Sequence, residues 1–176
     1  MELICVRHTS VDVPAGVCYG RTDVPLCATF EAEARRVSSR LAGRSFDAVL
    51  TSPSSRCVRL AAFCGFAGAV REARLSELDF GTWEMRRWDE LRGPDVQAWY
   101  DDWVRVPAGG AESLLEQYRR VAACVRGLSE RGTVSALLFT HGGVISCLRV
   151  CAGECTLEKA FERPVAFGET VSLRIG

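Results

Sequence analysis

Two short apolar runs near opposite ends of the chain, residues 3–6 and 136–139, are each followed directly by a polar segment that contains a histidine. These histidines, His8 and His141, are the only two among 176 residues. Apolar runs of this length are typical of buried strands, and ligands bind outside the carboxyl ends of strands in open parallel sheets. A lone histidine is more often an ordinary core or surface residue. The matching positions of these two instead predict one shared site at a sheet edge.

Segments with helical spacing of apolar residues separate the predicted strands. Strands are expected at residues 3–6, 46–50, 135–139 and 170–175, with a short one within 68–75. Helices are expected at residues 30–41, 52–63, 84–103 with a break near Gly93-Pro94, 112–131 and 142–152. This alternation predicts a three-layer α/β/α fold with a mostly parallel central sheet. The alternating pattern of the last segment predicts an antiparallel edge strand.

The length fits a single domain spanning residues 1–176, with residues 83–108 left over as a small helical cap. The formal net charge is zero and no block of like charges occurs, so the sequence indicates no nucleic-acid partner and no membrane-surface partner. No apolar stretch is long enough to span a bilayer. The first residues also turn polar too soon for a signal peptide. We expect a cytoplasmic monomer or homodimer that acts on a small molecule.

Nine cysteines are an unusually high number for such a chain. In a cytoplasmic protein they are interpreted as reduced thiols. No Cys-x-x-Cys pair occurs, and Cys147 and Cys151 lie one turn apart on a predicted helix, where they look like small core residues. The spacings therefore predict no metal site, and nothing in the sequence indicates a cofactor.

Three predicted strand ends carry side chains that suit a phosphate group: Arg7-His8, the segment 51–56 that ends in Arg56, and His141-Gly142-Gly143. Arginine forks match phosphate oxygens, and a glycine turn lets a helix N-terminus approach an anion. An imidazole can serve as the nucleophile. The residues therefore predict a phosphoryl-transfer site. They do not decide which of the nearby carboxylates would be the general acid: Glu77, Asp79 or Glu84.

These segments resemble motifs of the histidine phosphatase superfamily, which includes cofactor-dependent phosphoglycerate mutases and α-ribazole phosphatases. The motifs occur in family order and span nearly the whole chain: LICVRH at 3–8, TSPSSRC at 51–57, LSELDFGTWE at 75–84, GAES at 110–113 and FTHGG at 139–143. The resemblance implies a phosphoglycerate mutase-like fold and a phosphomonoesterase that works through a phosphohistidine.

The resemblance also implies a role for each matching residue. His8 would be the nucleophile, and Arg7, Arg56 and His141 would bind the phosphoryl oxygens. Glu77 would protonate the leaving alcohol and then activate water. Outside this set, Glu84 and Glu112 are interpreted as structural residues that brace the site or cap helices.

The loop after Thr9 departs from the mutase pattern, and the chain leaves little room for a large mutase cap. Residues 16–26, GVCYGRTDVPL, instead resemble α-ribazole phosphatases, which act in cobalamin biosynthesis. The expected reaction is hydrolysis of α-ribazole 5′-phosphate to α-ribazole, with Ser10, Tyr19 and Arg21 as candidate substrate contacts. The alternatives are a broad-specificity small-molecule or sugar phosphatase, a phosphoglycerate mutase, and a non-catalytic phosphate-binding module.

All four tryptophans lie within residues 83–103, beside the segment that contains Glu77. One interpretation is an aromatic wall, including Trp83, that stacks on a flat base in the substrate. The other is a helical hairpin that buries the indoles against the sheet.

Overall fold

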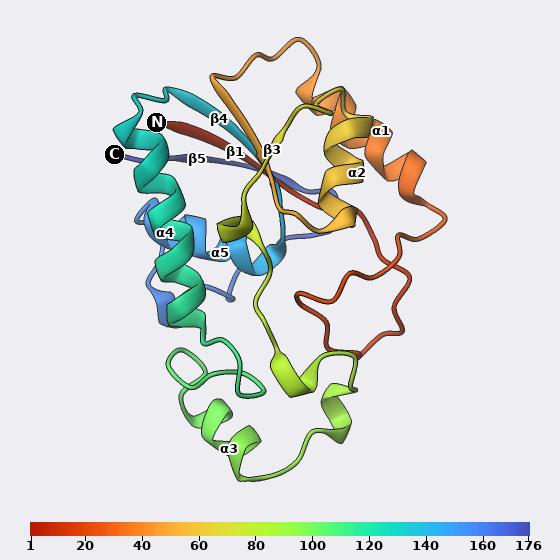
Figure 1. Cartoon of the computed structure of the whole chain (residues 1–176), viewed down its shortest axis with the longest axis vertical. Coiled ribbons are helices and arrows are strands. Elements are labelled where there is room, and N and C mark those ends of the chain that lie inside the picture. The colour runs from red at the N-terminus through yellow and green to blue at the C-terminus, as the bar shows by residue number, and fades with distance from the viewer.

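The computed structural model describes residues 1–176 and is built around a five-stranded sheet of order β3-β2-β4-β1-β5 (Figure 1). The strands are β1 (Glu2–Arg7), β2 (Ala48–Thr51), β3 (Val70–Arg71), β4 (Ser135–Thr140) and β5 (Thr170–Arg174). Every neighbouring pair is parallel except β1–β5, which is antiparallel. The predicted α/β fold with an antiparallel edge strand is therefore confirmed.

Helices cover both faces of the sheet. They are α1 (Phe30–Leu41), α2 (Ser55–Phe63), α4 (Leu114–Glu130) and α5 (Gly142–Cys151), while α3 (Pro94–Asp101) lies below the sheet (Figure 1). Successive residues of a strand point to opposite faces. Leu3 and Cys5 of β1 accordingly pack with residues of α4 and α5, whereas Ile4 and Val6 pack with residues of α1 and α2. These two clusters form the core on either side of the sheet.

The strand register brings distant segments together at the carboxyl edge. Arg7 pairs with Thr140, and the backbone N–H of His8 donates to the Thr140 carbonyl at 3.0 Å. The N–H of Ser52 donates to the Phe139 carbonyl at 2.8 Å. The segments that follow β1, β2 and β4 therefore start side by side.

Residues 83–108, here called the cap segment, contain less helix than the sequence predicts. The predicted helix over residues 84–103 is wrong for its first half, which holds only a 3₁₀ turn (Trp88–Glu90) before α3. Met85 has a φ of 63°, a left-handed conformation that interrupts any helix. The cap segment instead shares a third hydrophobic cluster with residues outside it, including Cys18 and Leu78.

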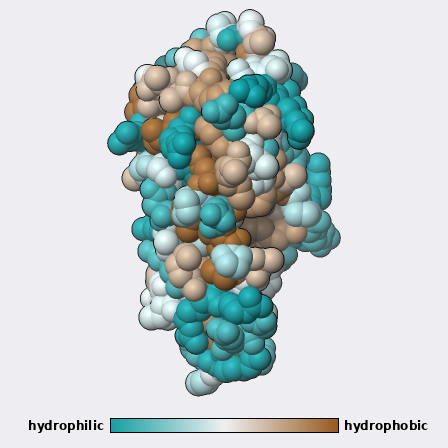
Figure 2. All heavy atoms as spheres, turned by 90° about the vertical axis from the view of Figure 1, so that its right-hand side faces the viewer, coloured by the Kyte–Doolittle hydropathy of each residue, from teal (hydrophilic) through white to brown (hydrophobic).

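The part of this region that faces the viewer in Figure 2 is mostly hydrophilic. Figure 2 shows mostly hydrophilic residues at the lower end of the molecule, and hydrophobic ones in a band across the middle of the same face. No helix in the chain is both long and apolar enough to cross a membrane.

Candidate active site

A cavity of about 230 Å³ opens at the carboxyl edge of the sheet. Four residues of the predicted phosphate site line it: Arg7, His8, Arg56 and Glu77. His141 lies next to it, with its ring centroid 5.2 Å from that of His8. A larger cavity of about 780 Å³ lies near β2 and β3, but none of these residues lines it. The smaller cavity is therefore the candidate site.

His8 is 2% exposed, and its Nδ1 lies 2.8 Å from the Thr9 carbonyl oxygen. A carbonyl can only accept, so Nδ1 carries the proton and Nε2 keeps a free lone pair. Burial, reinforced by the positive charge of Arg56, lowers the pKa of His8 to about 3. The imidazole is therefore neutral near pH 7, which is the form a nucleophile requires.

His141 is fully buried and is bound through both ring nitrogens. A guanidinium can only donate, so the Arg56 contact at 3.3 Å makes Nδ1 an acceptor. Nε2 then carries the proton and donates to Ser52 Oγ at 2.8 Å. Burial and the neighbouring cations lower the pKa of His141 well below its usual value. Positive charge in the site therefore comes from the arginines rather than from either histidine.

The two arginines are held by backbone carbonyls. Arg56 is fully buried and donates to the carbonyls of Gly20 at 2.6 Å and Thr22 at 2.9 Å, and its nearest carboxylate is Asp23 at 3.8 Å. Arg7 donates to the Val165 carbonyl at 2.5 Å. Each guanidinium also keeps a buried Nε–H that has no partner. Two such donors beside one cavity are suited to an oxyanion.

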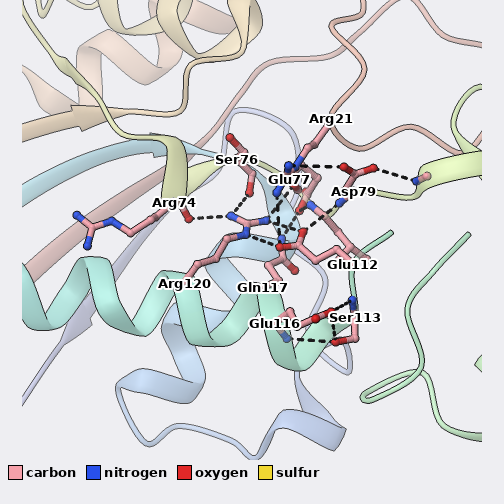
Figure 3. Close-up of polar contacts among 12 residues, drawn as sticks. Arg21, Arg74, Ser76, Glu77, Asp79, Glu112, Ser113, Glu116, Gln117 and Arg120 are labelled. Carbon is pink, nitrogen blue, oxygen red and sulfur yellow. Dashed lines mark hydrogen bonds and ion pairs between the residues drawn. The ribbon is translucent and has the colours of Figure 1, made fainter. Parts of the chain in front are cut away.

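Glu77 is fixed by three donors, of which Figure 3 labels Gln117. They are the Gln117 side-chain amide at 2.9 Å, the Gly143 backbone N–H at 3.1 Å and the Leu78 backbone N–H at 3.0 Å. Gly143 lies in the first turn of α5, so the carboxylate sits against the positive end of that helix. A Cβ at Gly143 would lie 2.4 Å from Glu77 Oε1. Only glycine allows this approach.

Arg120 and Glu112 hold the backbone around Glu77. Arg120 donates to the carbonyls of Arg74, Ser76 and Glu77 at 2.8, 2.7 and 3.0 Å (Figure 3). Its Nε also donates to Glu112 Oε1 at 2.7 Å, with both side chains mostly buried. Arg120 of helix α4 thereby fixes the loop after the 3₁₀ turn Ala73–Leu75, which carries the carboxylate.

Glu84 organises the other wall of the site. Its carboxylate accepts from the backbone N–H groups of Gly20 and Arg21, each at 3.0 Å, and from the Thr22 hydroxyl at 2.5 Å. The carbonyls of Gly20 and Thr22 in turn hold Arg56. Glu84 therefore acts on the site through this loop, as a bracing residue of the expected kind.

Comparison with known proteins identifies the family. Residues 3–175 match the family described as histidine phosphatase superfamily (branch 1). The chain belongs to this superfamily. It is 31% identical over 157 residues to the adenosylcobalamin/alpha-ribazole phosphatase of Escherichia coli K12, covering 84% of this chain and 77% of that one. It is 30% identical over 158 residues to a probable phosphoglycerate mutase of Yersinia enterocolitica, covering 84% and 73%.

Solved structures agree with this assignment. The alpha-ribazole phosphatase from Shigella flexneri superposes with a TM-score of 0.88 at 27% identity, covering all of this chain and 91% of that one. The chain is therefore a phosphatase with the phosphoglycerate mutase-like fold.

The predicted substrate contacts of the phosphatase fall into two groups. Tyr19 lines the cavity, with the Arg56 guanidinium 5.7 Å from its ring centroid. The other three do not line it. The Ser10 N–H is bound by Glu33 on α1, and Arg21 pairs with Asp79 and Glu112. Trp83 is 1% exposed and lies in the hydrophobic cluster that the cap segment shares with Cys18 and Leu78, here called the cap cluster.

Neither interpretation of the tryptophans holds in full: only Trp83 is buried, the other three are half-buried, and residues 83–103 form no helical hairpin against the sheet. Trp99 packs with Trp83 and Trp88 in the cap cluster, and Trp103 packs against Phe161. Trp88 alone lines the cavity of the phosphatase.

Two functional contacts were missed by the sequence analysis: Gln117 and Arg120. Gln117 is fully buried on the apolar face of α4, between Leu114 and Val121. A polar residue at such a position was the signal that could have found it.

Proposed function

We propose that this phosphatase hydrolyses α-ribazole 5′-phosphate through a phosphohistidine formed on His8. The observation that carries the mechanism is the free, neutral Nε2 of His8 in a cavity lined by two arginines with unpartnered donors. In the first step Nε2 attacks phosphorus, the bond to the ester oxygen breaks, and Glu77, which enters this step protonated, gives that oxygen its proton. Arg7 and Arg56 bind the phosphoryl oxygens, and His141, whose ring nitrogens are taken by Arg56 and Ser52, holds Arg56 in position.

In the second step water attacks phosphorus and Glu77 takes its proton. The bond to Nε2 breaks, inorganic phosphate leaves and His8 regains its lone pair. Donors aimed at the transferring group are expected to supply most of the rate enhancement.

Aromatic residues at the mouth support a substrate with a flat base. Four aromatic residues line the cavity: Tyr19, Phe80, Trp88 and Phe161. The Phe80 and Trp88 rings meet edge to face, with centroids 5.4 Å apart. Stacking on a base adds about 0.5–1.5 kcal/mol beyond area burial. Relatives named as α-ribazole phosphatases point the same way.

The mechanism is tested by quenching the enzyme with labelled substrate in base, in which phosphohistidine survives, and mapping the label. We expect label on His8 and no turnover in His8→Asn. Label on a serine or cysteine, or turnover without the His8 imidazole, would overturn the mechanism. Phosphate binding without any turnover would instead favour the non-catalytic module.

The substrate is tested separately by comparing kcat/KM across phosphomonoesters. We expect α-ribazole 5′-phosphate to exceed 3-phosphoglycerate and simple sugar phosphates by roughly tenfold or more. Preference for a sugar phosphate would favour the broad-specificity alternative. Transfer to phosphoglycerate that outpaces hydrolysis, in the presence of bisphosphoglycerate, would favour the mutase.

A further inference from the structure

Arg149 is a buried guanidinium with no carboxylate partner. It lies in the last turn of α5, at the opposite end of the helix from Gly143, and is 4% exposed. Its one hydrogen bond goes to the Arg163 carbonyl, and its Nε–H is buried without any partner. Burying a charge is costly unless it is paired. The fold therefore maintains a cation that lacks a counter-charge.

This guanidinium lines a polar cavity of about 450 Å³, separate from the catalytic one. Lys159 and Arg163 line the same cavity and are exposed to solvent. The carboxylates of Glu154 and Glu162 also line it, and Glu154 pairs with Arg163 at 3.4 Å. The three cations and two carboxylates give the cavity a net charge of plus one. The cation without a carboxylate partner at its base is the buried Arg149.

We propose that this cavity binds a small phosphate-type anion, with Arg149 as its base and Lys159 at its rim. The helix end itself does not oppose binding, because the carbonyls of Arg149 and Val150 already accept from the backbone N–H groups of Glu154 and Gly153. The bound group is inorganic phosphate or the phosphate of a small metabolite. Both present the same oxygens to a guanidinium.

The anion would also tie down a segment that reaches the catalytic site. The chain from Lys159 to Phe167 supplies the Arg163 carbonyl to Arg149 and the Val165 carbonyl to Arg7. It also places Phe161 in the wall of the catalytic cavity. An anion at Arg149 would therefore stabilise the segment that supports a catalytic arginine.

The test counts phosphate sites by calorimetric titration of the whole chain. We expect two sites in the wild type, one in Arg149→Met and one in Arg56→Met, which retains the Arg149 site. A wild type and an Arg149→Met variant that bind equal numbers of phosphates would overturn the proposal. A catalytically inactive protein would still show the phosphate site at Arg149. The test can therefore contradict this proposal without contradicting the proposed function, and the reverse.

A second pair of variants guards against misfolding of Arg149→Met. Lys159→Ala removes an exposed cation at the rim, and we expect it to weaken the second site by roughly fivefold or more, without changing competitive inhibition by phosphate. Arg35→Ala removes another exposed cation, one that pairs with Glu31 on α1 far from the cavity, and is the control. Equal affinities in the two variants would contradict the site.

Glycerol 3-phosphate identifies the source of the group. It is titrated into Arg56→Met/His8→Asn, which cannot hydrolyse it. Binding as tight as that of inorganic phosphate assigns the site to phosphorylated metabolites. Preference for inorganic phosphate assigns it to the free ion, and binding of neither overturns the proposal.

Discussion

Gly143 is the residue at which the smallest covalent change should disturb the chemistry. Its N–H donates to Glu77, and the space where a Cβ would stand is occupied by the same carboxylate. Gly142, one residue earlier, is different, because a Cβ there would make ordinary contact with Arg7 at 3.5 Å. The two adjacent glycines therefore offer a matched test of how Glu77 is positioned.

We predict that Gly143→Ala slows hydrolysis of alkyl phosphates by roughly tenfold or more, because a displaced Glu77 protonates the leaving oxygen poorly. Phosphoryl transfer from p-nitrophenyl phosphate to His8 should change much less, since nitrophenolate leaves without a proton. Gly142→Ala should leave the ratio of the two transfer rates near that of the wild type. Rapid-quench measurement of phosphoenzyme formation from both esters isolates this first step from the water attack that Glu77 also assists, and equal losses on both would argue against Glu77 as the acid.

The buried histidines make a second prediction, on pH. The folded chain keeps His8 neutral to a pKa of about 3, whereas the unfolded chain binds a proton near 6.5. The stabilisation is therefore complete above the unfolded pKa and is lost as the pH falls below it. His141 acts in the same direction. Each histidine contributes up to about 1.4 kcal/mol per pH unit to this loss.

Urea unfolding at about pH 7.5 and about pH 5 measures the effect. This window lies above the range in which carboxylates with a lowered pKa, such as Glu84, lose their contribution. His8→Asn should show a smaller loss of unfolding free energy across the window than the wild type does. The same loss in both would mean that His8 is not held neutral.

At the scale of elements, α4 supports the loop that carries Glu77 as well as covering the sheet. Arg120→Met should lower the free energy of unfolding by about 2–4 kcal/mol, because three backbone carbonyls lose their side-chain donor and the mostly buried Glu112 loses its shortest ion pair. It should lower kcat as well. Arg119→Met, on the exposed side of the same helix, should change stability by no more than about 0.5 kcal/mol. Denaturant titration of both variants decides whether the two positions differ.

The elements were predictable where a local pattern and the tertiary packing agree. Residues 3–6 and 136–139 are apolar runs that become central strands, and residues 114–130 carry an apolar stripe that becomes α4. The cap segment was not predictable, because the conformation around Glu84 depends on backbone donors from residues 20–22. That loop lies more than 60 positions away in the sequence. No pattern within the cap segment encodes such a contact.

The candidate site also contains residues that the sequence could predict and residues that it could not. His8, Arg56 and His141 could be predicted because they follow strands, and parallel strands bring their carboxyl ends to one edge. Ser10 and Arg21 lie close in sequence to this set, yet their partners are Glu33, Asp79 and Glu112. Pairing between side chains from different loops is set by the finished fold.

At the scale of the whole molecule, the pKa values of the cysteine thiols indicate how far the fold shields each of them from solvent. Burial raises the pKa of Cys18 and Cys57 to about 12, and that of Cys64, Cys124 and Cys151 to about 11. Cys5 and Cys147 are raised further. Because the thiolate is the reactive form, these seven should resist alkylation in the folded state.

Four thiols are partly exposed, and two of these, Cys64 and Cys151, have a raised pKa. We therefore predict that iodoacetamide labels the other two, Cys27 and Cys155, first. All nine should be labelled in urea. Peptide mass spectrometry after timed quenching identifies the sites. Early labelling of Cys57, which lies beside His141, would mean that the catalytic edge of the sheet opens in the native state.

The strand order also has a consequence for folding during synthesis on the ribosome. β1 is made first, but both of its neighbours in the sheet, β4 and β5, are made last. β1, the apolar strand that leads to His8, therefore leaves the ribosome early. It has no partner strand until β4 has been translated. A ribosome stalled before β4 would carry a nascent chain that has the proposed nucleophile but no pocket around it. Of the five strands, β1 would need protection by chaperones for the longest time.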